Sequence, residues 1–496
     1  MSEIPVEIFS SDQGRQIDRR AAELGEFRDG RLMRSAGRAA FDLIRDPWPA
    51  ARSIAICCGP GNNGGDGFVV AEMAALSGFR VDIVSFGSPK GPEACEAHRR
   101  AVDLGLRFSD ITSDWTSEVD LIVDGILGTG MKPKRDELIL EGIRKINQAR
   151  RPILALDIPT GLNADSGAVP NEAVSATATI KFVSLSPGIF MGNGPYRCGH
   201  LFFADLELPE SLLSGVQPVC RRITVDDVAK RCSNLPVPTH KGEAGHLLVI
   251  GGASGMSGAI RLTAEAALRA GAGSVTVVTE RDHAPFVNID RPELMVRGVA
   301  RGHELLPLFE GATGIVVGPG LGLSEWSQDL IAIVLDAGLP LVVDADALNL
   351  LAKQDVHNDE WILTPHPGEA GTLLHGTASV VQDNRLGAIR KIQEAYGGVC
   401  VLKGAGTLVG GYGSDLLLCD CGNYGMASAG MGDLLSGIIG AILVQGASLH
   451  NAAVCGTWFH SRAADLASAG GKRGMLAKDL LPFVRHLLDD PAFGNT

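Results

Sequence analysis

The sequence lacks an excess of basic residues. Its 496 residues include 44 Lys and Arg against 57 Asp and Glu, which gives a formal net charge of −13. Nucleic-acid-binding proteins need a basic footprint to neutralise phosphates, so this charge argues against that class. It does not exclude binding of a small phosphate compound, because backbone N–H groups at the start of a helix hold anions without Lys or Arg.

The sequence also lacks the signals of export and membrane insertion. Its apolar runs are interrupted before they reach the roughly 18 residues that a membrane span needs. The N-terminal segment MSEIPVEIFSSDQGRQIDRR has no apolar core of the kind found in signal peptides. The 10 cysteines form no CxxC pair and no zinc-like spacing with His, which indicates free thiols in a reducing compartment. We therefore expect a cytoplasmic protein with no membrane partner.

Glycine is abundant, and short β-branched runs recur along the chain. The 63 glycines follow no collagen-like period, so we expect them in turns and close backbone approaches. In both halves the β-branched runs alternate with helical patterns, which is typical of a parallel sheet covered on both faces. The predicted strands are 53–58, 81–86, 121–124, 153–157 and 201–205 in the first half, and 246–251, 274–278, 315–318, 341–344, 361–363 and 399–403 in the second.

A proline-containing segment separates the two halves. Residues 235–239 read LPVPT and show no periodicity, which favours a linker. We predict a first domain at 1–225, a linker at 226–239 and a second domain at 240–496, both domains of the α/β class. No internal repeat is present.

The first predicted strand is followed by a glycine-rich turn. Residues 59–68 read GPGNNGGDGF and precede a predicted helix. Such a turn lets a phosphate approach the backbone at a helix start. An ordinary strand-to-helix turn is the alternative, but it gives no reason for the crowding of Asn62, Asn63 and Asp66.

Two later strands of the first half end in an aspartate. Asp124 precedes GILGTG, and Asp157 precedes Thr160. Ligands of open α/β sheets bind at the carboxyl ends of the strands, so these residues and Asn63 are expected in one crevice. The oxygens of Asn63, Asp124 and Thr160 suit a hard cation, which leaves Asp157 for proton transfer. For each aspartate alone, a helix cap is the commoner role.

The motifs GPGNNGGDGF, DGILGTG and LDIPTGL together resemble the NAD(P)H-hydrate epimerase domain of the YjeF N-terminal family. The resemblance implies a Rossmann-like α/β/α sandwich that inverts the hydroxylated carbon of the hydrated nicotinamide ring. It implies Asp157 as the acid–base residue and a K⁺ site at Asn63, Asp124 and Thr160. The implied hydrate-binding residues are Asn62, Asn63, Gly64, Gly65, Asp66, Gly128, Thr129, Gly130 and Asp157.

The sequence departs from this family around the implied site. The loop after Gly130 reads MKPKRDEL instead of a basic and apolar pattern. Ser186 replaces the usual Lys of Lys-Pro-Gly, Asn193 replaces the usual Asp of Asp-Gly-Pro, and Arg34 follows Met33 where an acidic residue is usual. A reduced or altered epimerase, or a module that only binds, is therefore the alternative for the first half.

The second half carries a longer series of motifs. HKGEAGHLLVIGG (240–252) leads into a helix with a small first turn around Ala259, and GPGLG (318–322) ends another predicted strand. LTPHPGE (363–369) holds His366 between two prolines on a stiff loop, although a lone His is usually a surface residue. KGAGT (403–407) offers a glycine turn and Lys403 to a nucleotide.

The most specific motif of the second half is ASAGMGDLLSGIIGAIL, which starts at residue 427. Gly430, Met431 and Gly432 precede an apolar helix that we predict to start at Asp433, and their N–H groups are expected to form an anion hole. Asp433 beside this hole can take a proton from a hydroxyl as a phosphoryl group arrives. A simple helix cap is the alternative role for Asp433.

These motifs resemble the ribokinase-like superfamily and, within it, the ADP/ATP-dependent NAD(P)H-hydrate dehydratase family, over roughly residues 230–490. The resemblance implies a ribokinase-like α/β domain with Asp433 as catalytic residue. The implied hydrate contacts are Ala259, Gly320, Gly322, His366 and Asp433. The implied nucleotide contacts are Lys403, Gly404, Ala405, Gly406, Thr407 and Gly432.

Together the two resemblances predict a bifunctional isomerase and lyase. It would epimerise the R and S forms of NADH hydrate and NADPH hydrate and dehydrate the S form at the expense of ADP or ATP, with K⁺ and Mg²⁺. Phosphorylation turns a poor leaving group, hydroxide, into a good one. The alternative is a small-molecule kinase that stops at the phosphorylated product, with a non-catalytic N-terminal domain. We expect small-molecule substrates, no nucleic acid and a homo-oligomer.

Overall fold

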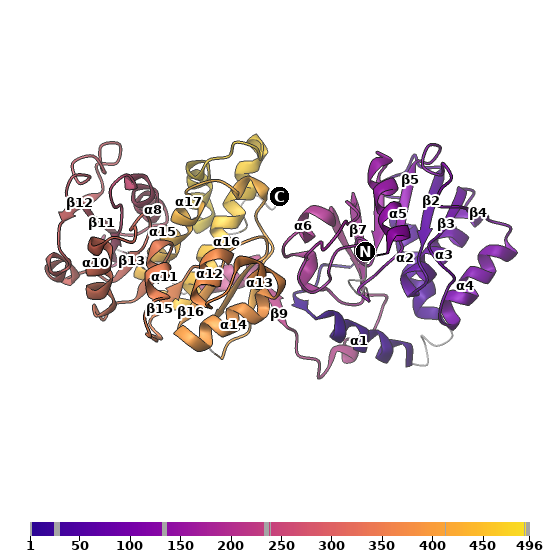
Figure 1. Cartoon of the computed structure of the whole chain (residues 1–496), viewed down its shortest axis with the longest axis horizontal. Helices are drawn as coiled ribbons and strands as arrows, with labels where there is room; N and C mark the ends of the chain where they lie inside the picture. The colour runs from indigo at the N-terminus through magenta and orange to yellow at the C-terminus, as the bar shows by residue number, and fades with distance from the viewer. Residues whose placement is uncertain are drawn as a thin grey trace. The chain divides into compact units, whose positions relative to one another are not determined.

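The computed structural model describes residues 2–23, 30–130, 136–232, 238, 240–411, 413–490 and 492. Contacts within the chain divide it into two compact units, residues 1–220 and 221–496, and both are of the α/β class (Figure 1). The boundary between the two units, after residue 220, lies ahead of the predicted linker at 226–239. Strand β9 (Cys220–Arg222) pairs with β18 (Leu417–Cys419), and Val228 of helix α7 (Val225–Cys232) lies in the core of the second unit. The first part of the predicted linker is therefore a packed helix, while most of the LPVPT segment lies outside the described residues.

The first unit contains one parallel sheet in the order β4-β3-β2-β5-β6-β7-β8. Its strands are β2 (Ser53–Cys58), β3 (Arg80–Ser85), β4 (Arg107–Ser109), β5 (Leu121–Gly125), β6 (Ile153–Leu156), β7 (Ala178–Phe182) and β8 (His200–Ala204). Its longer helices are α1 (Ser11–Glu23), α2 (Arg31–Ile44), α3 (Asn62–Leu76), α4 (Pro92–Asp103) and α5 (Glu137–Gln148).

Both faces of this sheet are covered, as its apolar strands require. Every residue of β2 is buried. Alternate strand residues such as Ile54 and Ile56 pack with α2, α3 and α4, and the intervening ones such as Ala55 pack with α5 on the other side. This confirms the predicted α/β/α sandwich.

The strand order reverses between β2 and β5. The chain runs from β2 outward through β3 to β4 and then returns to β5 on the other side of β2. Open α/β sheets bind ligands at such a switch point, outside the carboxyl ends of the strands. The turn after β2 and the loop after β5, which carry the first two motifs, flank this position.

The second unit has a mixed sheet in the order β9-β18-β17-β16-β15-β14-β13-β10-β11-β12. Among the pairs described, β17 is antiparallel to β16 and to β18, and the other pairs are parallel. Its other strands are β10 (His246–Ile250), β11 (Ser274–Glu280), β12 (Met295–Val299), β13 (Gly314–Val317), β14 (Leu341–Val343), β15 (Trp361–Leu363), β16 (Val399–Leu402) and β17 (Thr407–Gly411). Here the strand order reverses between β10 and β13.

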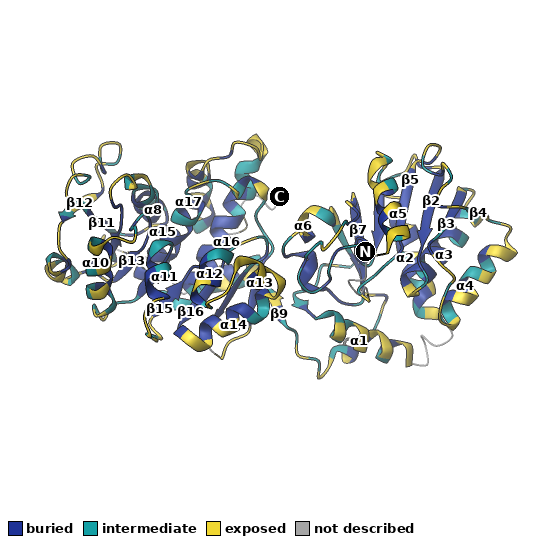
Figure 2. Cartoon of the chain, in the orientation of Figure 1, coloured by how far each residue is buried: buried dark blue, intermediate teal, exposed yellow. Residues whose placement is uncertain are grey.

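Helices cover this second sheet on both sides, and the strands lie buried between them (Figure 2). One apolar core joins alternate strand residues to α8 (Ser257–Arg269), α15 (Met431–Val444), α16 (Leu449–Ala467) and α17 (Leu481–Asp489). Helix α15 is apolar nearly all round because it packs against both α8 and the strands, and a Cβ on Gly437 would lie 2.1 Å from the carbonyl oxygen of Thr263. The other helices include α10 (Glu325–Leu335), α11 (Asp346–Leu351), α12 (Pro367–Leu373), α13 (Ala378–Asp383) and α14 (Arg385–Tyr396).

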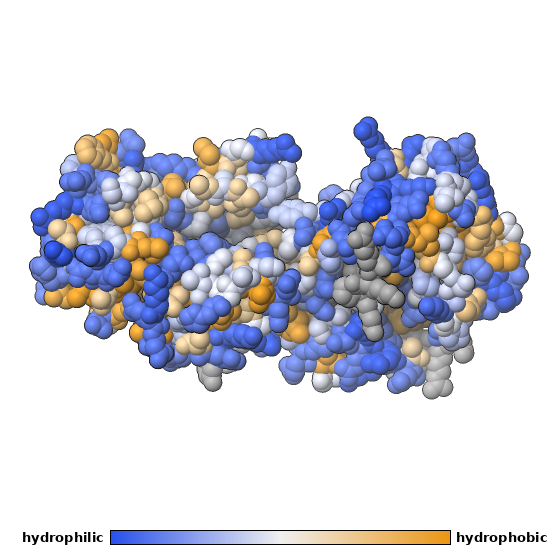
Figure 3. Space-filling model, viewed as in Figure 1, coloured by the Kyte–Doolittle hydropathy of each residue, from blue (hydrophilic) through white to orange (hydrophobic). Residues whose placement is uncertain are grey.

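The surfaces of both units are mainly hydrophilic on the face drawn in Figure 3, with apolar residues in small areas. Within the described parts of the chain, no helix combines the length and apolar character needed to cross a bilayer.

Candidate active sites

The first motif forms a turn in which the backbone is packed too closely for side chains. A Cβ on Gly59 would lie 1.7 Å from the carbonyl oxygen of Ile126, and a Cβ on Gly64 would lie 1.9 Å from that of Gly59. Gly65 is in a similar position, because its Cβ would meet the side chain of Met33 on α2 at 2.4 Å. The glycines thus let α3 begin at Asn62, directly beneath the loop that follows β5.

The predicted cation ligands lie at neighbouring strand ends. Oδ1 of Asp124 accepts a hydrogen bond of 2.7 Å from the Thr160 hydroxyl, and Oδ2 accepts one of 2.8 Å from the Thr160 N–H. Burial raises the pKa of Asp124 to about 6. Asn63 is 8% exposed, and its buried side-chain oxygen and nitrogen have no hydrogen-bond partner. A buried amide left without partners is rare, and it indicates that a group outside the protein completes this site.

Asp157 occupies an unusual backbone position at the end of β6. Its φ is 65°, in the left-handed region that residues with a Cβ seldom adopt. One carboxylate oxygen accepts a hydrogen bond of 2.9 Å from the N–H of Thr129, and the other pairs with the buried ammonium of Lys181 on β7. A Cβ on Gly128 would lie 2.7 Å from this carboxylate. The GTG loop after β5 and Asp157 are therefore in direct contact.

Two further carboxylates belong to the electrostatic surroundings of Asp157. Burial raises the pKa of Asp66 well above its usual value, and the charges of Asp157 and Asp18 add to this rise. Burial also raises the pKa of Asp18, to about 6, although the charge of Lys181 opposes the rise. Of Asp66, Asp18 and Lys181, only the first was predicted, because the other two belong to no glycine motif and follow no predicted strand.

Two other residues predicted for this site are exposed, and the loop that follows Gly130 is not fully described. Asn62 and Gly130 are exposed, and residues 131–135 of the loop after Gly130 lie outside the described part of the chain. Ser186, which departs from the family pattern, is buried with an unpartnered hydroxyl.

In the second unit, the predicted anion hole lies at the start of α15. Gly430 precedes the helix with a φ of 88°, and Met431 and Gly432 are its first residues. The N–H groups of a first helical turn have no partners within the helix, so they are available to an anion.

Asp433 follows directly in the same turn. Burial and the charge of Asp344 raise the pKa of Asp433 to about 6, against the opposing effect of Lys403. A carboxylate with a pKa near neutrality is suited to accept a proton and release it again.

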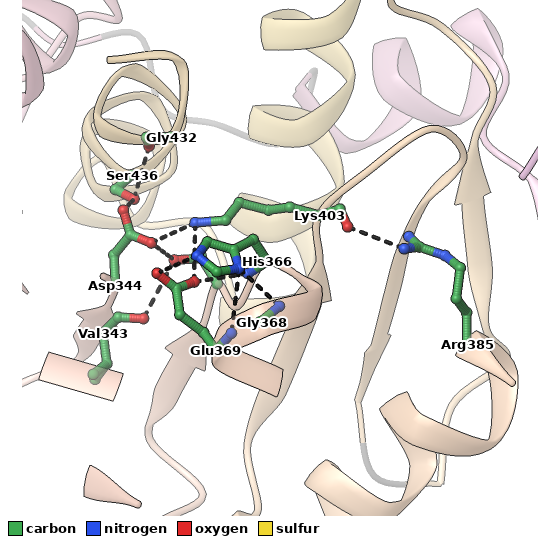
Figure 4. A network of polar contacts seen from close by, with 10 residues as sticks. Val343, Asp344, His366, Gly368, Glu369, Arg385, Lys403, Gly432 and Ser436 are labelled. Carbon is green, nitrogen blue, oxygen red and sulfur yellow. Dashed lines mark hydrogen bonds and ion pairs between the residues drawn. The ribbon is translucent and has the colours of Figure 1, made fainter. Parts of the chain in front are cut away.

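A network of polar contacts lies beside this turn (Figure 4). The ammonium of Lys403 lies 2.7 Å from Oδ1 of Asp344 and 3.6 Å from Oε2 of Glu369. Asp344 also accepts hydrogen bonds from the hydroxyls of Ser436, at 2.6 Å, and Thr364, at 2.8 Å. Burial would raise the pKa of Asp344, but Lys403 and these hydroxyls hold it below its usual value. Lys403 was predicted to contact the nucleotide, whereas its ammonium here points into a carboxylate cluster.

Two of the predicted hydrate contacts, Gly320 and Ala259, lie on separate elements that touch each other. A Cβ on Gly320 would lie 3.2 Å from the Cβ of Ala259, so the GPGLG turn touches the first turn of α8. The N–H of Gly322 donates a hydrogen bond of 2.8 Å to Asp346 at the start of α11. Gly432 lies beside the carboxylate cluster, since a Cβ on it would lie 3.4 Å from Nζ of Lys403.

His366 has a structural role that its sequence motif did not predict. Its Nδ1 accepts hydrogen bonds from the N–H groups of Gly368, at 2.9 Å, and Glu369, at 3.2 Å, and so caps α12. The side chain is 56% exposed, and Nε2 lies 3.3 Å from Oε1 of Glu369. The cap fixes the ring at the edge of the carboxylate cluster, where a substrate could still contact its exposed edge.

Two family models match the chain. The model described as YjeF-related protein N-terminus matches residues 29–188, and the model described as NAD(P)H-hydrate dehydratase matches residues 247–485. The chain is 43% identical to the bifunctional NAD(P)H-hydrate repair enzyme Nnr of Coxiella burnetii, over 97% of this chain and 99% of that one. It is 41% identical to the protein of the same name from Escherichia coli, over 98% of this chain and 95% of that one.

Solved structures resemble the second unit. A ribokinase-like superfamily protein from Enterococcus faecalis is 26% identical, with a TM-score of 0.50, and covers 54% of this chain and 95% of its own. A protein from Streptococcus mutans is 27% identical, with a TM-score of 0.51, and covers 54% of this chain and 99% of its own. These likenesses confirm the ribokinase-like fold predicted for the second half.

Proposed function

We propose the reactions of each site from one premise: the chain belongs to the family of bifunctional NAD(P)H-hydrate repair enzymes. It is an isomerase and a lyase that returns damaged, hydrated nicotinamide cofactors to use. The first unit interconverts the R and S forms of NADH hydrate and NADPH hydrate, and the second dehydrates the S form with ADP or ATP as co-substrate.

The observation that carries the dehydratase assignment is the position of Asp433 beside the N–H groups of Gly430, Met431 and Gly432. The hydroxyl of the hydrate loses its proton to Asp433 and attacks the terminal phosphorus of the nucleotide. A new O–P bond forms, and the bond to the departing nucleotide breaks. The N–H groups stabilise the charge on the transferred group, and catalysis of this kind depends mainly on positioning and electrostatics.

The phosphorylated hydrate then loses its phosphate. The C–O bond breaks, a proton leaves the adjacent ring carbon, and the ring C=C bond of the dihydronicotinamide is restored. The products are NAD(P)H, inorganic phosphate and either AMP from ADP or ADP from ATP. Ala259, Gly320, Gly322 and His366 would line the hydrate side of the site.

The nucleotide would lie along residues 403–407, with Gly432 at its phosphate end. Mg²⁺ would accompany it and offset phosphate charge. The carboxylates of Asp344 and Glu369 are already paired with Lys403, so the phosphates of the nucleotide would be the main ligands of this cation.

In the first unit, Asp157 is the acid–base residue of the epimerase. Its carboxylate is held by Lys181 and the N–H of Thr129, next to Gly128 and Gly130. Inversion requires the hydroxyl to leave as water with a proton from an acid, and water to return on the other face as a base takes a proton. Asp66 and the remaining residues of the first motif would contact the hydrate.

K⁺ would be held by Asn63, Asp124 and Thr160. The unpartnered oxygen of Asn63 and the buried carboxylate of Asp124 fit a cation that takes only oxygen ligands. A bound K⁺ supplies fixed positive charge at the switch point of the sheet, where the anionic cofactor would approach.

Product analysis separates this function from the alternative small-molecule kinase. The chain would be incubated with NADH hydrate, Mg²⁺ and ADP, and free phosphate and phosphorylated hydrate would be quantified together. The dehydratase releases phosphate in step with NADH, and Asp433→Asn should release neither. Accumulation of a phosphorylated product without NADH would assign the kinase function instead.

A further inference from the structure

Arg385 is a buried cation whose partners are neutral. It is the first residue of α14 and is 2% exposed. Nη1 donates to Oε1 of Gln382 at 3.0 Å and to the carbonyl of Lys403 at 3.2 Å, and Nη2 donates to the carbonyls of Leu402, at 3.0 Å, and Gly406, at 3.3 Å. Three of the four acceptors are backbone carbonyls of the KGAGT turn or the residue before it.

The stability of the fold alone does not explain a charged residue at this position. Burying a charge is costly unless it is fully hydrogen-bonded, and apolar residues of similar volume often replace such groups without loss. What a guanidinium adds is a rigid, planar set of donors in fixed directions. Here these donors bind three backbone carbonyls in and next to one short turn.

The guanidinium also defines the shape of the turn. A trans peptide directs its N–H opposite to its C=O, so the carbonyl of Lys403 held by Arg385 turns the N–H of Gly404 away from the core. Gly404 is exposed and has a φ of 136°, and a Cβ on it would lie 2.9 Å from Nη1 of Arg385. The glycine is required both by its backbone conformation and by the guanidinium behind it.

Lys403 links this turn to the carboxylate cluster. Its carbonyl is held by Arg385, while its ammonium pairs with Asp344 on the other side (Figure 4). The N–H of Lys403 donates to the carbonyl of Pro365 at 2.9 Å, which ties the turn to the loop that carries His366. Movement of the Lys403 backbone would therefore disturb both the nucleotide turn and the cluster.

We propose that Arg385 is a positioning residue for the nucleotide: it holds the Lys403–Gly406 turn from behind with the N–H of Gly404 directed outward. Arg385 itself does not touch substrate. The inference rests on the proposed nucleotide-binding role of residues 403–407.

The test compares Arg385→Lys with Arg390→Lys on the same helix, where Arg390 is exposed. Lysine keeps the charge, but its compact ammonium lacks the rigid planar fork of donors that spans these carbonyls. Steady-state rates with NADH hydrate would give KM for ADP and for the hydrate separately. For Arg385→Lys we expect KM for ADP to rise at least tenfold, with KM for the hydrate changed less than twofold and the epimerase rate of the same sample unchanged. Arg390→Lys should behave as wild type.

A purely structural role would lower the fraction of active enzyme, and so the apparent kcat, without separating the two KM values. An unchanged KM for ADP in Arg385→Lys would overturn the inference. If this variant does not fold, Gln382→Met removes only the exposed side-chain acceptor, and it should raise KM for ADP severalfold; no rise would contradict the proposal. If the wild-type chain shows no dependence on ADP or ATP at all, the proposed function has failed, which is a different result.

Discussion

The ammonium of Lys403 lies 2.7 Å from a carboxylate oxygen of Asp344, and Asp344 is 1% exposed. The carboxylate also receives two hydroxyl hydrogen bonds, so its charge is balanced inside the protein. Asp344 follows β14, and Lys403 follows β16. The pair therefore joins two strand ends directly below the first turn of α15.

Removal of one partner should leave an uncompensated buried charge. We expect Lys403→Met to destabilise the second unit by about 3–5 kcal/mol, the usual effect of breaking a buried ion pair from one side. Urea denaturation, recorded with a signal from the second unit, measures this loss of unfolding free energy. Lys353→Met, at an exposed lysine, is the control and should cost less than about 0.5 kcal/mol. A loss of similar size in both variants would contradict the paired state of Asp344.

Acid should weaken the same pair. Because the pKa of Asp344 is lower in the folded protein than in the unfolded chain, its contribution to stability is complete above the unfolded value and is lost as pH falls through the folded value. We expect the difference in unfolding free energy between wild type and Asp344→Asn to shrink below about pH 4. A difference that stays constant from pH 7 to pH 3 would contradict this assignment.

Asp433 should give the opposite pH dependence. Its raised pKa means that the folded protein binds a proton more tightly than the unfolded chain, so the ionised carboxylate destabilises the fold above about pH 6. Asp433→Asn should therefore be more stable than wild type at pH 8, on the order of 1–2 kcal/mol after allowance for partial exposure, with little difference near pH 4. Thermal unfolding at both pH values measures this.

The same substitution should abolish most dehydratase activity. We expect the rate constant to fall roughly 10²–10⁴-fold, as for loss of a general base. In the wild type, kcat/KM for the hydrate should decline as pH falls below about 6, when Asp433 becomes protonated. A variant that is more stable and still fully active would show that Asp433 only caps the helix.

The sequence predicted the architecture because hydrophobic pattern and glycine turns determine it. Each predicted strand is present: 53–58 and 361–363 have the predicted bounds, and the others differ by one or two residues at their ends. The prediction missed several strands, among them β7, whose sequence ATIKF includes the buried Lys181, and β12, whose sequence MVRGV is half exposed at the sheet edge. In both strands a polar or small residue interrupts the apolar run.

The sites were harder to predict in full. Glycine motifs indicated the turns, but partners such as Lys181, Asp18 and Arg385 come from distant elements, and no local pattern reveals which strand or helix they face. For His366 the sequence predicted a substrate contact but not its cap on α12, because that cap depends on the backbone geometry of the loop. The cytoplasmic location and the homo-oligomer stay predictions.

Asp157→Ala should remove epimerisation and leave dehydration of the S form intact. The exchange of R and S hydrate, followed chromatographically, should slow to the uncatalysed rate. Asp114→Asn, at an exposed position of the same unit, is the control and should leave the exchange rate unchanged. An unchanged rate in Asp157→Ala would support a first unit that only binds the cofactor.

K⁺ should stabilise the first unit through Asn63. We expect the melting temperature to rise in KCl relative to choline chloride at equal ionic strength, because a bound ion stabilises the folded state that holds it. Asn63→Ala should lose this rise. An equal rise in the variant would show that K⁺ acts elsewhere.

The central claim is that this chain restores NADH from its hydrate by using a nucleotide. The most direct measurement incubates the purified protein with NADH hydrate, Mg²⁺, K⁺ and ADP or ATP and records absorbance at the NADH band. We predict nucleotide-dependent recovery that consumes both epimers faster than their uncatalysed exchange. No recovery with either nucleotide would contradict the claim.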